Sequence, residues 1–300
     1  ELGNTHKAIE FYEKSLVIHQ DSGNHQGESA TLINLGNAYL FLGDPRKAIG
    51  FYEKSLEIAR ENNNRFHESV NLGNLGSSHF ILDNTQKAIG FFREALAIKR
   101  EIGERQGEAI FLGETGNVFL SLGEYQQAQE NYKQAIQIAD EISFPTVQLN
   151  AHWGLAQVYL FQNDLVNARA TIGAALQYDV PQNNHNATAL HGIIALLQGE
   201  RETAQEAFTK SIAQADEILA KTPDYYSALD AKGLSICGLL ICDLRLKKDD
   251  LRSEAVETFR KARKIAPHAG VVKSVLRLFD ELVKCDEEGV LKGVRKAVEG

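Results

Sequence analysis

The apolar, small and polar positions of this chain recur with a spacing of forty residues. Alanines stand at positions 8, 48, 88, 128 and 168, and an aromatic or imidazole ring stands at 39, 79, 119 and 159. Several matched steps at one period are typical of a repeat protein, in which each unit buries its apolar face against its neighbours.

Each unit is predicted to form a helix, a turn and a second helix. Leu32, Leu35, Gly36 and Tyr39 have the three- and four-residue spacing of one helical face. Residues that tolerate a left-handed backbone are expected where the first helix of each unit ends, namely at Gly3, Gly43, Asp83, Gly123, Asn163 and Gly199. N-cap residues for the second helix follow in three units at Asn4, Asp44 and Asn84.

The second helix begins with Pro45 in one unit, where a missing amide hydrogen costs nothing. This helix continues with the small residues Ala48 and Ser55 on either side of the large Tyr52. The pattern predicts a tight hairpin with one aromatic ring packed between its two helices. Together with the first helix, these residues resemble the tetratricopeptide repeat, whose usual unit has about 34 residues. The longer units are similar to those of kinesin light chain, spindle-orientation adaptors and the C-terminal repeats of bacterial signalling ATPases.

This resemblance implies an all-α fold, a right-handed α–α superhelix with C-terminal capping helices. We expect regular forty-residue units over 1–184, the first of them truncated, and two irregular units over 185–270. Capping helices are expected over 271–300, with an amphipathic helix at 271–284 and a short last helix at 288–298. The run 224–246 is compatible with one long helix.

The composition of the chain disfavours several classes of protein function. The 300 residues carry a net charge of −8, which disfavours binding to nucleic acid or to anionic membranes. The sequence has no apolar run long enough for a membrane span, and we interpret the three cysteines as reduced thiols of a cytoplasmic protein. It has no methionine and starts within the repeat pattern, so we expect it to be part of a longer protein.

Candidate binding residues lie on the first helices, which line the concave groove of such a superhelix. Asparagine is a poor helix residue, and its amide can pair with the N–H and C=O groups of a bound peptide. The resemblance places Asn37 and Asn117 at the position that clamps peptide, although such residues could instead join neighbouring helices. Trp153 fits equally a core plug or an aromatic anchor. The predicted groove residues are Asn34, Asn37, Asn74, Ser77, Glu114, Asn117, Trp153 and Gln157.

A second ladder follows the linkers between units, where Arg65 and Arg105 are forty residues apart. Glu68 and Glu108 each follow three residues later, so each arginine could pair with its own helix. Alternatively, the two arginines bind carboxylates of an acidic partner.

No catalytic or nucleotide-binding motif is present, so we predict no enzymatic activity, no cofactor and no metal site. The predicted function is binding of a partner protein or peptide in the concave groove, as the C-terminal sensor or scaffold of a larger signalling protein. The alternatives are a structural homo-oligomer, with a homodimer through the C-terminal helices as one form, and small-molecule binding in the groove.

Overall fold

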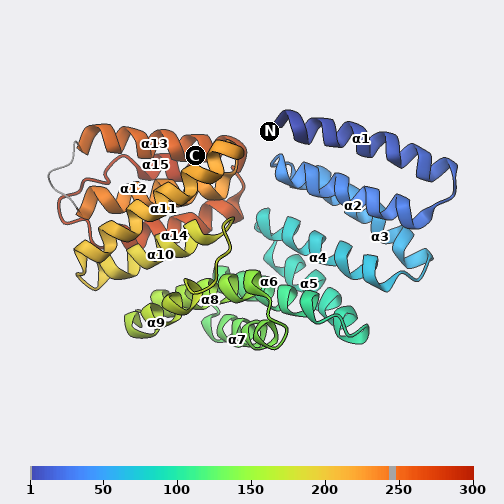
Figure 1. Ribbon diagram of the computed structural model, residues 1–300, viewed down its shortest axis with the longest axis horizontal. Coiled ribbons are helices and arrows are strands. Elements are labelled where there is room, and N and C mark those ends of the chain that lie inside the picture. The colour runs from blue at the N-terminus through green and yellow to red at the C-terminus, as the bar shows by residue number, and fades with distance from the viewer. Residues whose placement is uncertain (1, 243–247) are drawn as a thin grey trace. The chain divides into compact units, whose positions relative to one another are not determined.

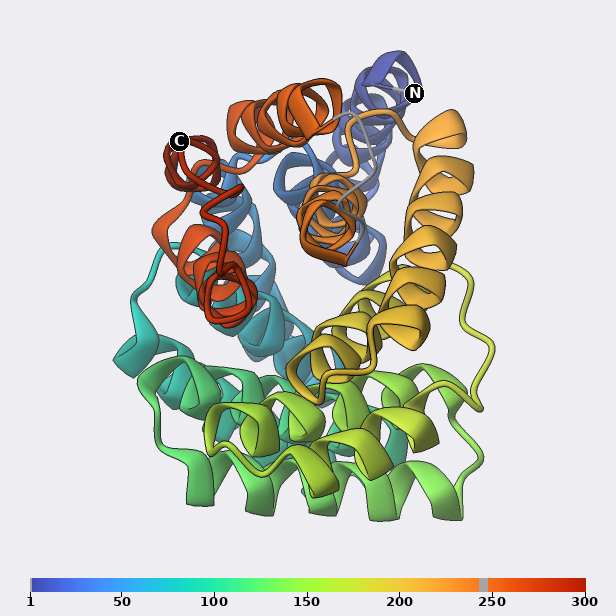
Figure 2. The ribbon, with the colours of Figure 1, turned by 90° about the vertical axis from the view of Figure 1, so that its left-hand side faces the viewer.

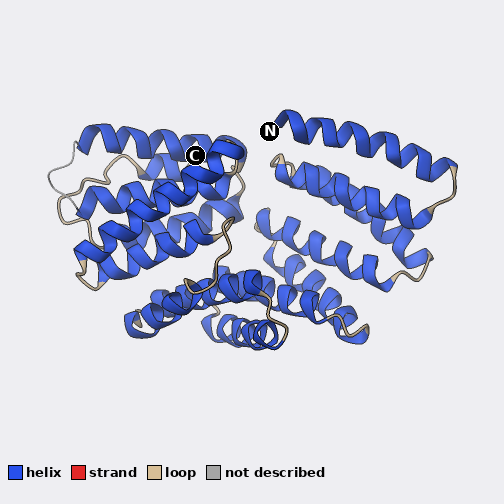
Figure 3. Ribbon diagram, in the orientation of Figure 1, coloured by secondary structure: helices blue, strands red, loops and turns tan. Residues whose placement is uncertain are grey.

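The computed structural model describes residues 2–242 and 248–300, and over these residues it has fifteen helices and no strand (Figure 3). The predicted all-α fold is therefore confirmed. The chain divides into two compact units, Glu1–Val118 and Phe119–Gly300, with helix α6 crossing the boundary (Figure 1).

Unit 1 contains helices that pack in sequence order: α1 (Leu2–Asp21), α2 (His25–Phe41), α3 (Pro45–Glu61), α4 (Arg65–Ile81), α5 (Thr85–Glu101) and the start of α6 (Arg105–Leu122). Unit 2 continues with α7 (Tyr125–Glu141), α8 (Pro145–Phe161), α9 (Leu165–Ala175), α10 (Asn184–Leu197), α11 (Arg201–Lys221), α12 (Tyr226–Cys242), α13 (Lys248–Ile265), α14 (Ala269–Val283) and α15 (Arg295–Glu299). We call the first helix of each hairpin its A helix and the second its B helix. The A helices are α2, α4, α6, α8, α10 and α12.

The turns inside the hairpins confirm five of the six predicted left-handed positions. Positive φ angles occur where left-handed residues were expected, at Gly43, Asp83, Gly123, Asn163 and Gly199. The Asp44 side chain accepts a hydrogen bond from the Lys47 amide, and Pro45 opens α3. A second set of positive φ angles, which the sequence analysis missed, ends the B helices at Gly23, Asn63, Gly103 and Ser143.

Some predicted helix ends were wrong. Helix α1 begins at Leu2, so Gly3 and Asn4 lie inside it rather than at a turn. Asn84 is the N-cap residue of α5 as predicted, although its side chain makes no capping hydrogen bond and its amide lies 3.4 Å from His79 Nδ1. The helix expected over 288–298 is limited to α15, because Gly289 and Gly293 have positive φ angles. The long run to 246 is helical through Cys242, and its remainder lies outside the described residues.

Close contact between a ring and a glycine defines the hairpin core. The buried Tyr52 ring of α3 lies so near Gly36 of α2 that a Cβ there would be 2.3 Å from a ring carbon. Phe92 and Gly76 repeat the contact one unit later, where the corresponding distance would be 2.8 Å. Alanines at 48 and 88 are fully buried beside these rings. Any side chain at the glycine would force the two helices apart.

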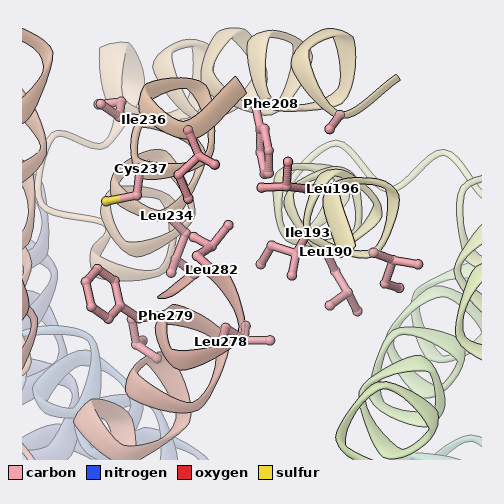
Figure 4. Packing of buried hydrophobic residues seen from close by; sticks show 14 of the residues in the cluster. Leu190, Ile193, Leu196, Phe208, Leu234, Ile236, Cys237, Leu278, Phe279 and Leu282 are labelled. Carbon is pink, nitrogen blue, oxygen red and sulfur yellow. The ribbon is translucent and has the colours of Figure 1, made fainter. Parts of the chain in front are cut away.

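In unit 2, α14 is the amphipathic helix expected at 271–284, and its residues Val275, Leu278, Phe279 and Leu282 are buried. It packs on the A helices α10 and α12, whereas α15 packs on α13 and α14. Figure 2 shows α12 between α11 and α14. Leu278, Phe279 and Leu282 belong to the same apolar cluster as residues of α10 and α12 (Figure 4). The C-terminal helices therefore complete the core of unit 2.

Ala88→Leu should lower the free energy of unfolding by about 1–3 kcal/mol, because the site has no room for added methyl groups. Urea unfolding followed by circular dichroism measures it. Gln86→Leu, which adds similar volume at an exposed position of the same helix, is the matched control and should change little. Equal stability of both variants would show that the helix contact is misplaced.

His185 on α10 makes stability depend on pH. Its side chain is fully buried with no hydrogen-bond partner for either ring nitrogen among the described residues, and burial lowers its pKa to about 4. The unfolded chain binds this proton near pH 6.5, so stability should fall as the pH drops from 6.5 toward 4. We expect a loss of about 2 kcal/mol between pH 7 and 5 from this group.

The variant His185→Phe should reduce that pH dependence, since the ring is replaced by one that takes up no proton. The exposed His6→Phe is the control and should leave the pH dependence unchanged. Urea unfolding at pH 7 and at pH 5 compares the three proteins. An unchanged difference in the His185 variant would contradict this assignment.

Candidate functional site

The A helices of unit 1 present a row of polar side chains, which we call the unit 1 face. Asn34 and Asn37 on α2 are exposed, while Asn74 and Ser77 on α4 are partly exposed. The row continues on α6 with two partly exposed residues, Glu114 and Asn117. The packing that buries Leu35 and Leu75 in the hairpins turns these neighbouring positions outward.

Hydrogen bonds orient part of this face. The Tyr52 hydroxyl donates to Asn37 Oδ1 over 2.7 Å, and Asn74 Nδ2 approaches the same oxygen at 3.5 Å. Burial raises the pKa of Tyr52, so its hydroxyl remains a donor. Asn37 therefore partly joins neighbouring helices, as one interpretation predicted. Because the Asn37 oxygen accepts from Tyr52, the Nδ2 group of Asn37 points away from Tyr52 and can donate a hydrogen bond elsewhere.

Glu114 is the one acidic member of the unit 1 face. Burial raises the pKa of its carboxyl group, and a hydrogen bond from Asn117 Nδ2, 3.4 Å from Oε2, acts in the opposite direction. In such surroundings, a partner that brings hydrogen-bond donors or positive charge stabilises the charged form of the carboxyl group.

Trp153 and Gln157 on α8, the corresponding residues of unit 2, are less accessible. Gln157 is buried, and Trp153 packs against the apolar cluster of that unit. The indole N–H and the Gln157 amide nitrogen are covered and have no hydrogen-bond partner in the part of the chain that the structure describes.

The arginine ladder forms carboxylate clamps between successive hairpins. In each clamp, a glutamate in the first turn of an A helix, with its side chain only 10% exposed, accepts from two arginines. One arginine comes from the end of the preceding B helix, and the other is the ladder arginine itself. The clamps are Arg60 and Arg65 on Glu68, at 3.0 and 2.6 Å, and Arg100 and Arg105 on Glu108, at 2.8 and 2.6 Å.

Arg65 also pairs with Glu101 of the next B helix. The local interpretation of this ladder therefore describes the structure, and the sequence analysis missed the B-helix arginines Arg60 and Arg100. Their forty-residue spacing and their place in the last turn of each B helix were signals that could have identified them.

Residues 2–242 and 248–300 contain no group of three His, Cys, Asp or Glu side chains placed to hold a metal ion. None of the described helices combines the length and apolar character needed to cross a membrane.

Two family profiles match the sequence of this chain. The profile of the MalT-like TPR region matches residues 37–231, and a tetratricopeptide-repeat profile matches residues 1–61. The chain belongs to the tetratricopeptide-repeat family. No curated protein matches it by sequence.

Solved structures show the same repeat fold at low sequence identity. The Rap conjugation gene regulator of plasmid pLS20, in complex with the Phr* peptide, has a TM-score of 0.69 and 16% identity, covering 93% of this chain and 76% of that one. The apo quorum sensor NprR of B. thuringiensis has a TM-score of 0.65 and 13% identity, covering 95% and 86%. A signal transduction ATPase with a tetratricopeptide-repeat sensor, from Pyrococcus horikoshii, has a TM-score of 0.56 and 18% identity, covering 99% and 44%.

Glu108→Gln should destabilise this tetratricopeptide-repeat protein by about 1–2 kcal/mol, because two charge-assisted bonds to a nearly buried carboxylate weaken. Glu94→Gln is the control, since Glu94 is exposed and its 3.6 Å pair with Arg60 is a surface ion pair. Denaturant unfolding compares the two. If Glu108→Gln unfolded like the control while Arg105→Ala abolished partner binding, the arginines would belong to the binding surface instead.

Proposed function

We propose that this protein is a protein-interaction module and that an extended peptide segment of a partner binds along the unit 1 face. The observation that carries the proposal is the exposed amide row of Asn34, Asn37 and Asn74 on successive A helices. Asparagine costs helix stability, and the Asn34 side chain makes no hydrogen bond within the described part of the chain. An amide placed in this way can donate to a peptide carbonyl and accept from a peptide N–H.

The face also favours a particular kind of segment. Burial raises the pKa of its only acid, Glu114, so a lysine, an arginine or a free N–H group of the peptide would stabilise the charged carboxylate. We propose that the bound segment is polar or basic at this point. The net charge of −8 also favours a partner segment that is not acidic.

One structural neighbour supports peptide binding as the activity, and two others support a role in sensing. The Rap regulator is described in complex with a peptide, and NprR is described as a quorum sensor. The Pyrococcus horikoshii neighbour carries its repeats as the sensor of a signal transduction ATPase. By analogy, we propose that this chain is the sensor or scaffold part of a cytoplasmic signalling protein and has no catalytic activity of its own.

The alternative function is a structural homo-oligomer, and the packing of α14 argues against the form that dimerises through the C-terminal helices. The apolar residues Val275, Leu278, Phe279 and Leu282 of α14 are buried within unit 2. Val283 is the one large apolar residue of α14 that stays exposed, at 43%. A single exposed side chain is ordinary for a protein surface.

The quadruple variant Asn34→Ala, Asn37→Ala, Asn74→Ala and Asn117→Ala should lose peptide binding while keeping its fold. Peptides selected from a displayed random library against the wild-type chain serve as probes, and fluorescence polarisation gives their affinities. We expect binding to weaken at least about tenfold, since several peptide hydrogen bonds are lost together. Thermal unfolding should remain cooperative, with a small decrease in Tm from the loss of the Tyr52–Asn37 hydrogen bond.

The matched control replaces four exposed glutamines of the B helices with alanine: Gln86, Gln126, Gln127 and Gln134. This control removes the same number of amides from another face and should bind normally. If the asparagine variant binds the selected peptides at full strength, or if the glutamine variant loses binding, the unit 1 face is not the site.

A further inference from the structure

The A helices of unit 2 are covered by a helix of the same chain. Helix α14 lies on α10 and α12, with Val275, Leu278, Phe279 and Leu282 turned into the apolar cluster (Figure 4). Their spacing of three and four residues forms a single apolar stripe. The A-helix residues Leu190, Ile193, Leu234 and Cys237 belong to the same cluster. The A-helix surface of unit 2 is thus covered by apolar side chains of the same chain.

One arginine of α14 reaches farther along the unit. An Arg277 Nη1 hydrogen bond goes to the Leu120 carbonyl, and Nη2 donates to the Tyr125 hydroxyl over 3.0 Å. The guanidinium carbon also lies 4.1 Å from the centre of the Phe161 ring, in a cation–π contact.

These three groups stand at helix ends, since Leu120 is in the last turn of α6, Tyr125 opens α7 and Phe161 closes α8. Carbonyl groups at a helix C-terminus carry partial negative charge and need donors. Together, the groups form a subsite suited to a guanidinium group, which can donate hydrogen bonds while its flat face rests on a ring.

The attachment of α14 has the character of a bound ligand. A non-helical stretch at 266–268 precedes it and turns follow it from 284 to 294, so both of its ends are irregular. No B helix pairs with it in the way that α11 and α13 pair with α10 and α12. It also buries the carboxylate of Glu281, whose partner Lys284 is on the same chain segment at 2.7 Å, and this desolvation opposes docking.

We propose that the α14-binding surface, formed by the apolar residues of α10 and α12 together with the guanidinium subsite, is a second interaction site, and that α14 is its internal ligand. Its partner is an amphipathic helix with apolar residues at the spacing of α14 and an arginine in place of Arg277, which binds by displacing α14. This partner class deepens the proposed function of the chain as an interaction module, but it depends on no residue of the unit 1 face.

The test uses the full chain and, as probe, a fluorescent peptide with the sequence of residues 268–285. In the wild type the internal helix competes with the probe, whereas in the full-length variant Arg277→Ala it is held less firmly. The probe should therefore bind Arg277→Ala at least about tenfold more tightly than wild type. Lys292→Ala, which removes an exposed charge after α14, is the control and should bind the probe as wild type does.

A second probe carrying the Arg277→Ala change should bind the Arg277→Ala chain at least about tenfold more weakly than the first probe, if the guanidinium subsite contributes to recognition. Hydrogen–deuterium exchange of the wild-type chain needs no variant and covers the case in which Arg277→Ala does not fold. In the wild-type chain, the backbone amides of α14 should exchange at least about tenfold faster than those of α10 and α12.

Equal exchange rates in α14, α10 and α12 would overturn the proposal, because α14 would then leave only when the whole unit unfolds. Absence of probe binding to a folded Arg277→Ala chain, or equal binding of that chain and wild type, would also overturn it. None of these three results would affect the peptides selected for the unit 1 face, so failure of this proposal is distinguishable from failure of the proposed function.

Discussion

The regular hairpins depend on the contact between one ring of the B helix and one glycine of the A helix. Tyr52 against Gly36, Phe92 against Gly76 and Phe208 against Gly192 occupy equivalent places, sixteen residues apart in each case. Only a residue without a side chain allows the ring so close, and the ring fixes the distance between the helices and their rotation. That rotation determines which A-helix positions are buried and which remain available to a partner. In the first of these hairpins the ring also carries a hydroxyl group that holds Asn37, so the contact that builds the core also orients the candidate site.

The sequence could predict the features that depend on residues close together in the chain. The forty-residue period located the hairpins, and the left-handed residues located the turns, because both depend on neighbours within one repeat. The same reasoning placed Asn34, Asn37 and Asn74 on the outward face of their helices. It failed where the period gave no guidance, as in the start of α1 at Leu2 and the glycine-broken segment before α15.

Long-range contacts could not be predicted in this way. Arg277 bonds to a carbonyl group 157 residues away, and no periodic pattern connects the two positions. The partial burial of Trp153 and the burial of Gln157 have a similar origin, because the exposure of a helix face depends on what the rest of the unit places over it. Equivalent positions of the repeat therefore differ in their surroundings. They are polar and at least partly exposed on α2 and α4, and they are covered on α8. The clamps at Glu68 and Glu108 show a further use of the period, in which charges join one hairpin to the next.

The central claim is that a partner peptide lies on the A helices of unit 1. Hydrogen–deuterium exchange of the full chain, with and without a saturating library-selected peptide, tests it most directly, because it locates the contact without any substitution. The account predicts slower exchange in 25–41, 65–81 and 105–118, and unchanged exchange in the B helices at 45–61 and 85–101. Protection confined to the B helices, or to the C-terminal helices alone, would contradict it.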